Sequence, residues 1–271
     1  MKLSIITINY NNLAGLQQTI NSVVGQTFSD YEWIVIDGGS TDGSKDYIQE
    51  HAHHLSYWVS EKDNGVYHAM NKGIAQAHGE WMLFLNSGDS LCDEYVLSKV
   101  VSHQLSGDVL YGNAYYVNPD GSYRIKRDPD DVGISFLLTQ TFCHQATFVK
   151  ASLLKDSPYD EQYKIAADWA KWFQLMVEGK HFVHVDEFVV NFDTTGIGST
   201  PTESLRLERD HVLQQYLPHH VRIEADRIVK MQVKWGFLEQ RKSLRLITKW
   251  FYKFCRSINW ILNKIERIHR P

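Results

Sequence analysis

The sequence is poor in cysteine and lacks any long uninterrupted apolar run. Its three cysteines (Cys92, Cys143 and Cys255) stand far apart in 271 residues and form no CxxC pair. We therefore expect free thiols in a reducing compartment and no disulfide framework. The apolar run after Met1 stops at Asn9, which is too short for a signal peptide, and no stretch reaches transmembrane length. These absences predict a cytoplasmic protein.

A strong positive charge is also missing from the chain as a whole. The formal net charge is -4, which argues against a general nucleic-acid binder. The charge is unevenly spread, because residues 241–271 hold nine Lys or Arg and one Glu. An acidic body with a basic C-terminal tail therefore describes the chain better than its net charge does.

The first half of the sequence alternates short apolar runs with helical patterns. We predict strands at 3–8, 32–36, 57–59 and 81–85, and helices at 13–24, about 41–48 and 66–77. Ser40 or Thr41 would cap the second helix. This alternation predicts an α/β fold with right-handed βαβ units and a mostly parallel sheet. Ligands bind beyond the carboxyl ends of such strands.

The pattern loosens in the second half. It predicts a hairpin of strands 115–117 and 123–126, further strands at 146–149 and 188–192, a helix at about 168–178, and helix from 203 onward. With 43% hydrophobic residues the chain can build one sizeable core. We expect one large α/β domain at 1–203, a helical extension at 204–240 and a basic amphipathic helix at 241–271.

Two acids directly follow predicted strands and precede small residues. Asp37 follows the run 32–36 and precedes two Gly and a Ser, and Asp89 follows the run 81–85 after three residues and stands between Gly and Ser, so a ligand or a divalent cation can approach them closely. Asp89 would offer a hard oxygen ligand to Mg²⁺ or Mn²⁺. Clusters of Asp and Gly are also ordinary turn residues. Because several such clusters fall at one predicted sheet edge, we favour a binding site.

The segment 63–73 opens a helix after a glycine. A helix N-terminus favours an anion, and Tyr67, Asn71 and Lys72 lie within about a turn of one another. An N-cap followed by a solvated lysine explains the same residues, so this segment is ambiguous by itself.

Taken together, these stretches resemble the inverting family 2 glycosyltransferases, which have a GT-A fold, a Rossmann-like sheet with helices on both faces. The resemblance covers roughly residues 1–200 and is closest to the subgroup that builds colanic-acid-type exopolysaccharides and O-antigens. It rests on the segments 3–12, 26–43, 63–73 and 86–89. Two departures stand out: Asp37-Gly38 replaces the usual Asp-Asp, and Asn86-Ser87-Gly88-Asp89 replaces the usual Asp-Ser-Asp-Asp.

The resemblance assigns roles on the donor side. Asp37 would contact the base or ribose of the donor, with Asn9 and Asp63 lining the same pocket. Asp89 would hold the divalent cation, Mg²⁺ or Mn²⁺, under the diphosphate. The remaining donor-binding candidates are Tyr67, Asn71, Lys72, Ser87 and Gly88.

The resemblance also assigns a catalytic base. It picks Asp168, in the sequence Ala167-Asp168 where the family often has Glu-Asp; a helix cap is the alternative reading. His144 and Gln145 occupy a family position near the acceptor mouth, although a lone histidine is usually structural. Gly198 and Ser199 lie in a small-residue loop that would close over the diphosphate, or would serve as an ordinary connector.

The tail suggests where the reaction takes place. Apolar residues recur every three or four positions from 244 to 268, and Lys and Arg fill much of the remainder, as in an interfacial membrane helix. Packing on protein is the alternative. The expected partners are a nucleotide-sugar (UDP by default, GDP or dTDP as alternatives), a lipid-linked saccharide acceptor and an anionic membrane surface on the inner face of the cell membrane. A homodimer stays open.

Two other functions fit parts of the pattern. A sugar nucleotidyltransferase also places a nucleotide on an α/β sheet, but the chain has no Gly-rich N-terminal loop followed by a basic residue. A non-catalytic saccharide-binding or scaffold protein would not need both Asp89 and Asp168. We therefore expect an enzyme that transfers a hexose-type sugar.

Overall fold

The central strands of the fold consist of residues that are buried on both sides. The computed structural model describes residues 3–103, 106–196 and 202–240, and their side chains as far as Met231. Strand β1 (Leu3–Asn9) is buried along its whole length, and β2 (Tyr31–Asp37) is buried in all but its first residue. Parallel strands covered on both faces have this near-continuous apolar composition.

The sheet is parallel on its N-terminal side. Strand β1 pairs in parallel with β2 and β4 (Trp81–Phe84), and β2 pairs in parallel with β3 (Tyr57–Ser60). The nine strands follow the order β3-β2-β1-β4-β8-β6-β9-β5, with β7 paired to β6. The carboxyl ends of β1, β2 and β3 therefore meet at one edge, as the alternation in the sequence predicts.

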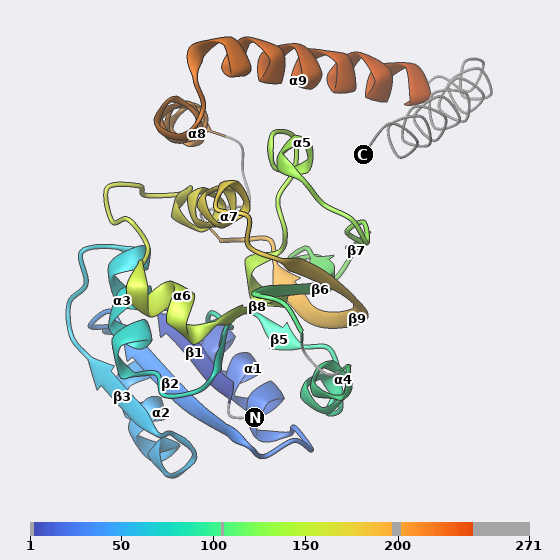
Figure 1. The fold of residues 1–271 in the computed structure, drawn as a ribbon. Helices are drawn as coiled ribbons and strands as arrows, with labels where there is room; N and C mark the ends of the chain where they lie inside the picture. The colour runs from blue at the N-terminus through green and yellow to red at the C-terminus, as the bar shows by residue number, and fades with distance from the viewer. Residues whose placement is uncertain (1–2, 104–105, 197–201, 241–271) are drawn as a thin grey trace. The chain divides into compact units, whose positions relative to one another are not determined.

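Helices cover both faces of this parallel half (Figure 1). On one face Leu3 and Ile5 share a core with α1 (Leu13–Val24), α2 (Ser44–Glu50) and α4 (Val96–Ser102). On the other face α3 (Val66–Gln76) comes so close that a Cβ on Gly73 would lie 2.4 Å from Ile6. The alternation of side chains along a strand explains why β1 serves both layers.

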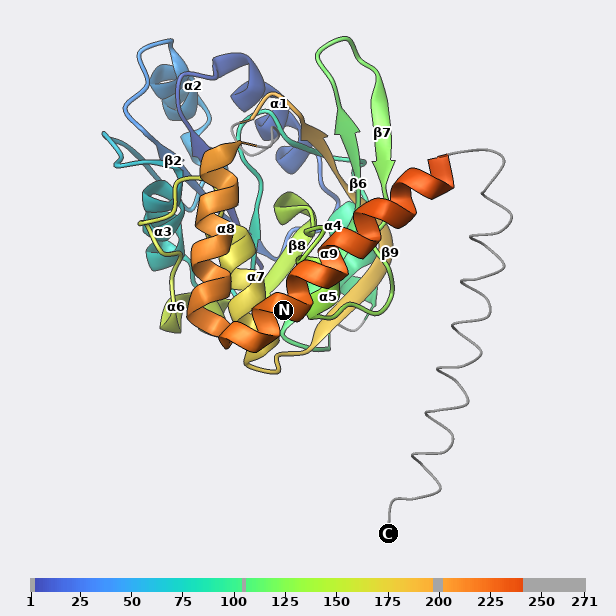
Figure 2. The same ribbon diagram turned by 90° about the horizontal axis from the view of Figure 1, so that it is seen from above.

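The second half of the sheet is mixed. Strands β6 (Val109–Val117) and β7 (Tyr123–Lys126) form the predicted hairpin, which Figure 2 shows side by side. Strand β8 (Thr147–Lys150) runs antiparallel to β4 and β6, whereas β9 (Phe182–Asp193) runs parallel to β6. The short β5 (Ser90–Leu91) pairs antiparallel with the end of β9. Two short helices, α5 (Ile134–Leu137) and α6 (Ala151–Asp156), complete this half.

The helical C-terminal part was also predicted. Helix α7 (Ala167–Val177) carries Asp168, and α8 (Glu203–Tyr216) begins where the sequence indicates. The chain divides into two compact units, Met1–Tyr216 and Leu217–Pro271, so α8 belongs to the unit that contains the sheet. In the second unit, α9 (His219–Gln240) is described, and the predicted tail helix at 241–271 lies outside the described residues.

One local prediction was wrong. Neither Ser40 nor Thr41 caps the second helix, which begins at Ser44 after Gly43 with a positive φ of 95°. Ser40 instead turns back toward Asp37, since a serine hydroxyl three residues after a strand-end carboxylate reaches it directly. The two described cysteines, Cys92 and Cys143, are free thiols as expected.

Candidate active site

Asp37 lies at the centre of a row of polar side chains across three strand ends. The parallel register pairs Asn9 of β1 with Asp37 of β2, and Asp37 with Ser60 of β3. Asn9 donates to Asp37 Oδ1 at 2.7 Å, and the Ser60 hydroxyl donates to Oδ2 at 2.6 Å. Ser40 adds its backbone N–H at 2.9 Å and its hydroxyl at 2.5 Å.

These donors keep Asp37 charged. Burial by itself would raise the pKa of Asp37, but the hydrogen bonds from Ser40, Ser60 and Asn9 outweigh it and lower the pKa. In return, Asn9 Oδ1 is buried without a hydrogen-bond partner in the part of the chain that the structure describes. Buried acceptors of this kind are rare and call for a partner. The sequence pattern identified Asp37 and Asn9 but missed Ser40 and Ser60 as partners.

A second acid faces the same strand ends. A Cβ on Gly38 would lie 3.2 Å from Asp63 Oδ2 and 3.1 Å from the ring of Tyr10. Asp63 therefore lies next to the turn after Asp37, and its place in a donor pocket stays a prediction. Lys72 pairs with Asp63 at 2.5 Å and with Glu61 at 2.8 Å. Tyr10, which the sequence analysis did not single out, is largely exposed beside this turn.

Asp89 lies close to a second acid, Asp193. The pairing of β5 with β9 brings them together, and the backbone N–H of Asp193 donates to Asp89 Oδ1 at 2.9 Å. Gly88, directly before Asp89, has a φ of 105°, and a Cβ there would come within 2.8 Å of Asp193 Oδ2. Only glycine adopts this conformation without strain and leaves room for the second acid.

The two acids suit a divalent cation. Burial raises the pKa of Asp89 to about 8, and the nearby charge of Asp193 adds to the increase. Asp89 is buried and Asp193 is half-buried, and two carboxylates close to each other repel unless a cation or a proton offsets their charge. No group of three or more His, Cys, Asp or Glu side chains suited to a metal exists among the described residues. A cation here would therefore need further oxygens from substrate or water, which is usual for Mg²⁺.

Gln145 and His144 connect this pair of acids to Asp168. The side chain of Gln145 hydrogen-bonds to Asp89, and the preceding residue, His144, lies in the field of Asp168. Burial lowers the pKa of His144, while the charge of Asp168 acts in the opposite direction. His144 Nε2 lies 2.8 Å from the hydroxyl of Tyr159. The ring of Tyr159 in turn packs on that of Tyr67, whose hydroxyl lies 3.1 Å from Asp168 Oδ1.

Asp168 is held through one of its two oxygens. Oδ1 accepts the backbone N–H of Trp169 at 2.8 Å and lies 3.1 Å from the hydroxyl of Tyr67. The same hydroxyl donates to the carbonyl of Ile165 at 2.7 Å. Oδ2 accepts no hydrogen bond from any described residue, so this oxygen is available to a substrate.

The other predicted residues take different positions. Tyr67 faces Asp168, and Asn71 uses its amide to hold Tyr159 and Glu161, so donor contact stays a prediction for both. Ser87 lies beside Gly88, where its backbone N–H donates to Ile8 and its carbonyl accepts from Asn12. Gly198 and Ser199 lie outside the described residues.

The fold is that of a GT-A glycosyltransferase. The chain belongs to glycosyl transferase family 2, whose model matches residues 4–166. It is 36% identical over 203 residues to an uncharacterized glycosyltransferase of Mycobacterium tuberculosis, which covers 73% of this chain and 77% of that protein. It is also 29% identical over 259 residues to a PGL/p-HBAD biosynthesis glycosyltransferase of Mycobacterium bovis, which covers 91% and 96% of the two chains.

Solved structures confirm the fold. Staphylococcus aureus TarS in complex with UDP-GlcNAc superposes with a TM-score of 0.64 at 19% identity, over 84% of this chain and 70% of the other. The mannosyltransferase PcManGT of Pyrobaculum calidifontis, in complex with GDP-Man and Mn²⁺, superposes with a TM-score of 0.58 at 16% identity, over 91% and 83%. The exopolysaccharide and O-antigen subgroup stays a prediction.

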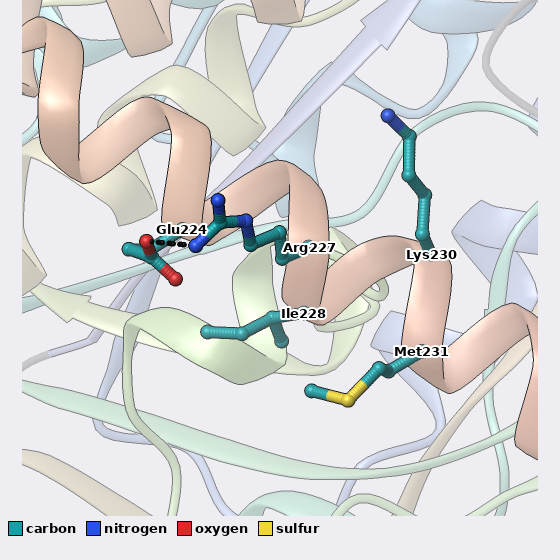
Figure 3. A pocket seen from close by; sticks show the side chains of 5 residues that line it. All are labelled: Glu224, Arg227, Ile228, Lys230 and Met231. Carbon is teal, nitrogen blue, oxygen red and sulfur yellow. Dashed lines mark hydrogen bonds and ion pairs between the residues drawn. The ribbon is translucent and has the colours of Figure 1, made fainter.

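Two further features concern the rest of the chain. None of the described helices is both long and apolar enough to cross a membrane. A pocket on α9 is lined by Glu224, Arg227, Ile228, Lys230 and Met231 (Figure 3). Glu224 and Arg227 form an ion pair at 2.6 Å, and none of the predicted site residues takes part. We assign this pocket no role in catalysis.

Proposed function

We propose that this protein transfers one hexose-type sugar from a nucleotide-sugar to an acceptor hydroxyl, with inversion, in surface polysaccharide biosynthesis. The observation that carries the proposal is a series of contacts from the segment His144–Gln145 to Asp168. His144 Nε2 lies 2.8 Å from the Tyr159 hydroxyl, the ring of Tyr159 packs on that of Tyr67, and the Tyr67 hydroxyl lies 3.1 Å from Asp168 Oδ1. Gln145 hydrogen-bonds to Asp89, which supports one site for the acid suited to a cation and the acid suited to proton transfer. A single displacement at a sugar carbon requires both groups at one place.

The donor nucleotide would lie against the ends of β1, β2 and β3. Asn9 Oδ1 offers a buried acceptor without a partner among the described residues, which suits an N–H of the base. Asp37 and Asp63 would bind the base or ribose, and the exposed ring of Tyr10 would stack on the base. We take UDP as the default nucleotide, with GDP and dTDP as alternatives.

Asp89 and Asp193 would hold Mg²⁺ or Mn²⁺ beneath the diphosphate. The bound cation would offset the negative charge that develops on the leaving diphosphate. Gly88 keeps the space between the two carboxylates open, and Gln145 orients Asp89. The pairing of β5 with β9 fixes the positions of both acids, which keeps the site in place before substrate arrives.

Asp168 would accept the proton of the acceptor hydroxyl. Tyr67 and the N–H of Trp169 hold Oδ1, which leaves Oδ2 free to receive the proton. Burial lowers the pKa of His144, so its ring stays neutral and adds no positive charge beside the base. Tyr159 and Tyr67 complete an aromatic wall around this acid.

The acceptor that we propose is a lipid-linked saccharide at an anionic membrane surface. The support is the basic amphipathic pattern of residues 241–271, where each Lys or Arg would contribute about 1 kcal/mol beside an anionic leaflet. The similarity to a PGL/p-HBAD biosynthesis glycosyltransferase over almost its whole length points in the same direction.

The test is a screen of UDP-, GDP- and dTDP-sugars for thermal stabilisation that depends on Mn²⁺, followed by an assay of nucleoside diphosphate release. Asp89→Ala should abolish the Mn²⁺-dependent stabilisation. Asp168→Asn should keep it and lose release, because the base does not hold the donor. Asp46→Asn is the control, since it changes an exposed acid in the first turn of α2. Near-normal release by Asp168→Asn would refute the proposed mechanism.

A further inference from the structure

The N-terminus of α7 is capped by a residue from α8. The carboxylate of Glu208 accepts the backbone N–H of Lys164 at 2.9 Å, of Ile165 at 3.0 Å and of Ala166 at 2.9 Å. Ala166 is the N-cap residue of α7 and has no side chain that could cap the helix. A glutamate more than 40 residues later in the chain therefore binds the N–H of the N-cap residue and of the two residues that lead into the helix.

This cap holds the backbone directly before Asp168. Ile165 is fixed on both sides, because Glu208 takes its N–H and Tyr67 donates to its carbonyl at 2.7 Å. Asp168 lies in the first turn that follows, so the direction of its free Oδ2 depends on how this turn is oriented. The negative charge of Glu208 also suits the positive end of the α7 dipole.

The next residue of α8 contacts the residue that follows Asp168. The guanidinium of Arg209 lies over the ring of Trp169, 4.9 Å from its centroid. Helix α8 thus touches the chain before Asp168 through Glu208 and directly after it through Arg209. Both residues lie beyond the segment 4–166 that the family model matches.

We propose that Glu208 is a positioning residue for Asp168. Glu208 does not touch the substrate; it holds the N–H groups of residues 164–166 and so keeps Oδ2 of Asp168 directed at the acceptor hydroxyl. The proposal rests on the proposed role of Asp168 as the base. A displacement of about 1 Å at a catalytic group can cost roughly 100-fold in rate, so a cap that fixes this turn matters for turnover.

The experiment compares Glu208→Gln with Glu208→Asp and the control Glu203→Gln. Glutamine loses the charge and one of the two acceptor oxygens that serve three N–H groups, whereas aspartate keeps both oxygens. Glu203 is exposed, lies in the first turn of the same helix and pairs with Arg206. The probes are UDP-GlcNAc, UDP-glucose and GDP-mannose with Mn²⁺ and with water as acceptor, and the readout is nucleoside diphosphate release.

We expect kcat of Glu208→Gln to fall by about tenfold or more, with the KM for the donor unchanged, while Glu208→Asp recovers part of the loss and Glu203→Gln behaves like the parent. Hydrogen exchange should accelerate at residues 164–166 and stay unchanged at 147–150. A fall in kcat at unchanged KM separates positioning from a general loss of folded protein, which exchange over the whole chain would reveal.

The comparison of Glu208→Gln with Asp168→Asn decides the mechanism. If Glu208 acts through Asp168, removal of Glu208 lowers kcat but costs less turnover than removal of the base itself. Normal kcat in Glu208→Gln while Asp168→Asn is inactive would overturn the positioning role and leave the proposed function standing. Normal turnover of Asp168→Asn would overturn both.

Discussion

The backbone N–H of Asp193 donates a hydrogen bond of 2.9 Å to the carboxylate of Asp89, although 104 residues separate the two in the chain. The short β5 makes this contact possible because it pairs with Val190 and Asn191 of β9, just before Asp193. Asp89 lies between β4 of the parallel half and the short β5, whereas Asp193 ends β9 of the mixed half. The cation site that we propose would take one carboxylate from each of these places.

Asp193→Asn should therefore weaken cation binding. The variant keeps the backbone N–H that reaches Asp89 but removes the second negative charge, so we expect the Mn²⁺ concentration for half-maximal donor stabilisation to rise roughly 10- to 100-fold. Titration of Mn²⁺ in a thermal-shift assay with a fixed donor measures this. Asp186→Asn, on the same strand and exposed, should leave the titration unchanged. Equal Mn²⁺ dependence in Asp193→Asn and the parent would exclude Asp193 as a ligand.

Gly88→Ala should damage the same site through sterics. A methyl group there would lie 2.8 Å from Asp193 Oδ2, and the φ of 105° is unfavourable for any residue with a side chain. We expect a loss of about 1–3 kcal/mol in the free energy of unfolding, measured by urea denaturation, together with weaker Mn²⁺ dependence. Gly133→Ala is the matched control, because a Cβ there meets nothing within 4 Å. Equal free energies of unfolding for Gly88→Ala and Gly133→Ala would contradict the steric argument.

The sequence predicted the parts of the site that follow strands with a clear apolar pattern. Asp37 ends a buried apolar run and Asp89 follows one by four residues, and the parallel order of β1, β2 and β3 follows from the alternation of strands and helices. Asp193 also ends an apolar strand, but its closeness to Asp89 depends on the two-residue β5, which is too short to leave a periodic pattern. Long-range pairings of this kind cannot be read from local spacing.

The same limit applies to side chains that share a helix. Spacing placed Tyr67, Asn71 and Lys72 on one polar surface of α3, yet each contacts a different segment. Tyr67 reaches Asp168, Asn71 holds Tyr159, and Lys72 pairs with Asp63. Helical spacing defines the face but not the neighbour across it, which depends on how distant segments pack.

Asp37→Asn should lower both stability and donor binding. An amide has one acceptor oxygen and would direct its NH₂ group at Ser40 or Ser60, whose hydroxyls now donate to the carboxylate. Because buried donors would lose their acceptor, we expect a loss of about 1–3 kcal/mol in the free energy of unfolding. Urea denaturation checks this, with Asp46→Asn as the exposed control. Undiminished donor-dependent stabilisation of the variant would remove Asp37 from the nucleotide pocket.

Lys171 gives a prediction about pH that is independent of the active site. Its ammonium is buried on α7 and donates to the Ser157 carbonyl at 2.6 Å, the Ser157 hydroxyl at 2.8 Å and Gln174 Oε1 at 2.8 Å. Burial lowers its pKa from 10.5 to about 8. Between these two values the unfolded chain holds a proton at this position that the folded protein has released.

Folding stability should therefore rise as pH increases through the window from about 8 to 10.5, because the unfolded state binds more protons there. Below about pH 8 both states are charged, and this group adds no slope. Lys171→Met removes the titration, so the difference in unfolding free energy between the parent and the variant should grow with pH across the window. Urea denaturation at several pH values measures it, with the exposed Lys155→Met as control. A difference that stays constant with pH would show that Lys171 remains charged in the folded protein, because three hydrogen bonds would then offset the cost of burying its charge.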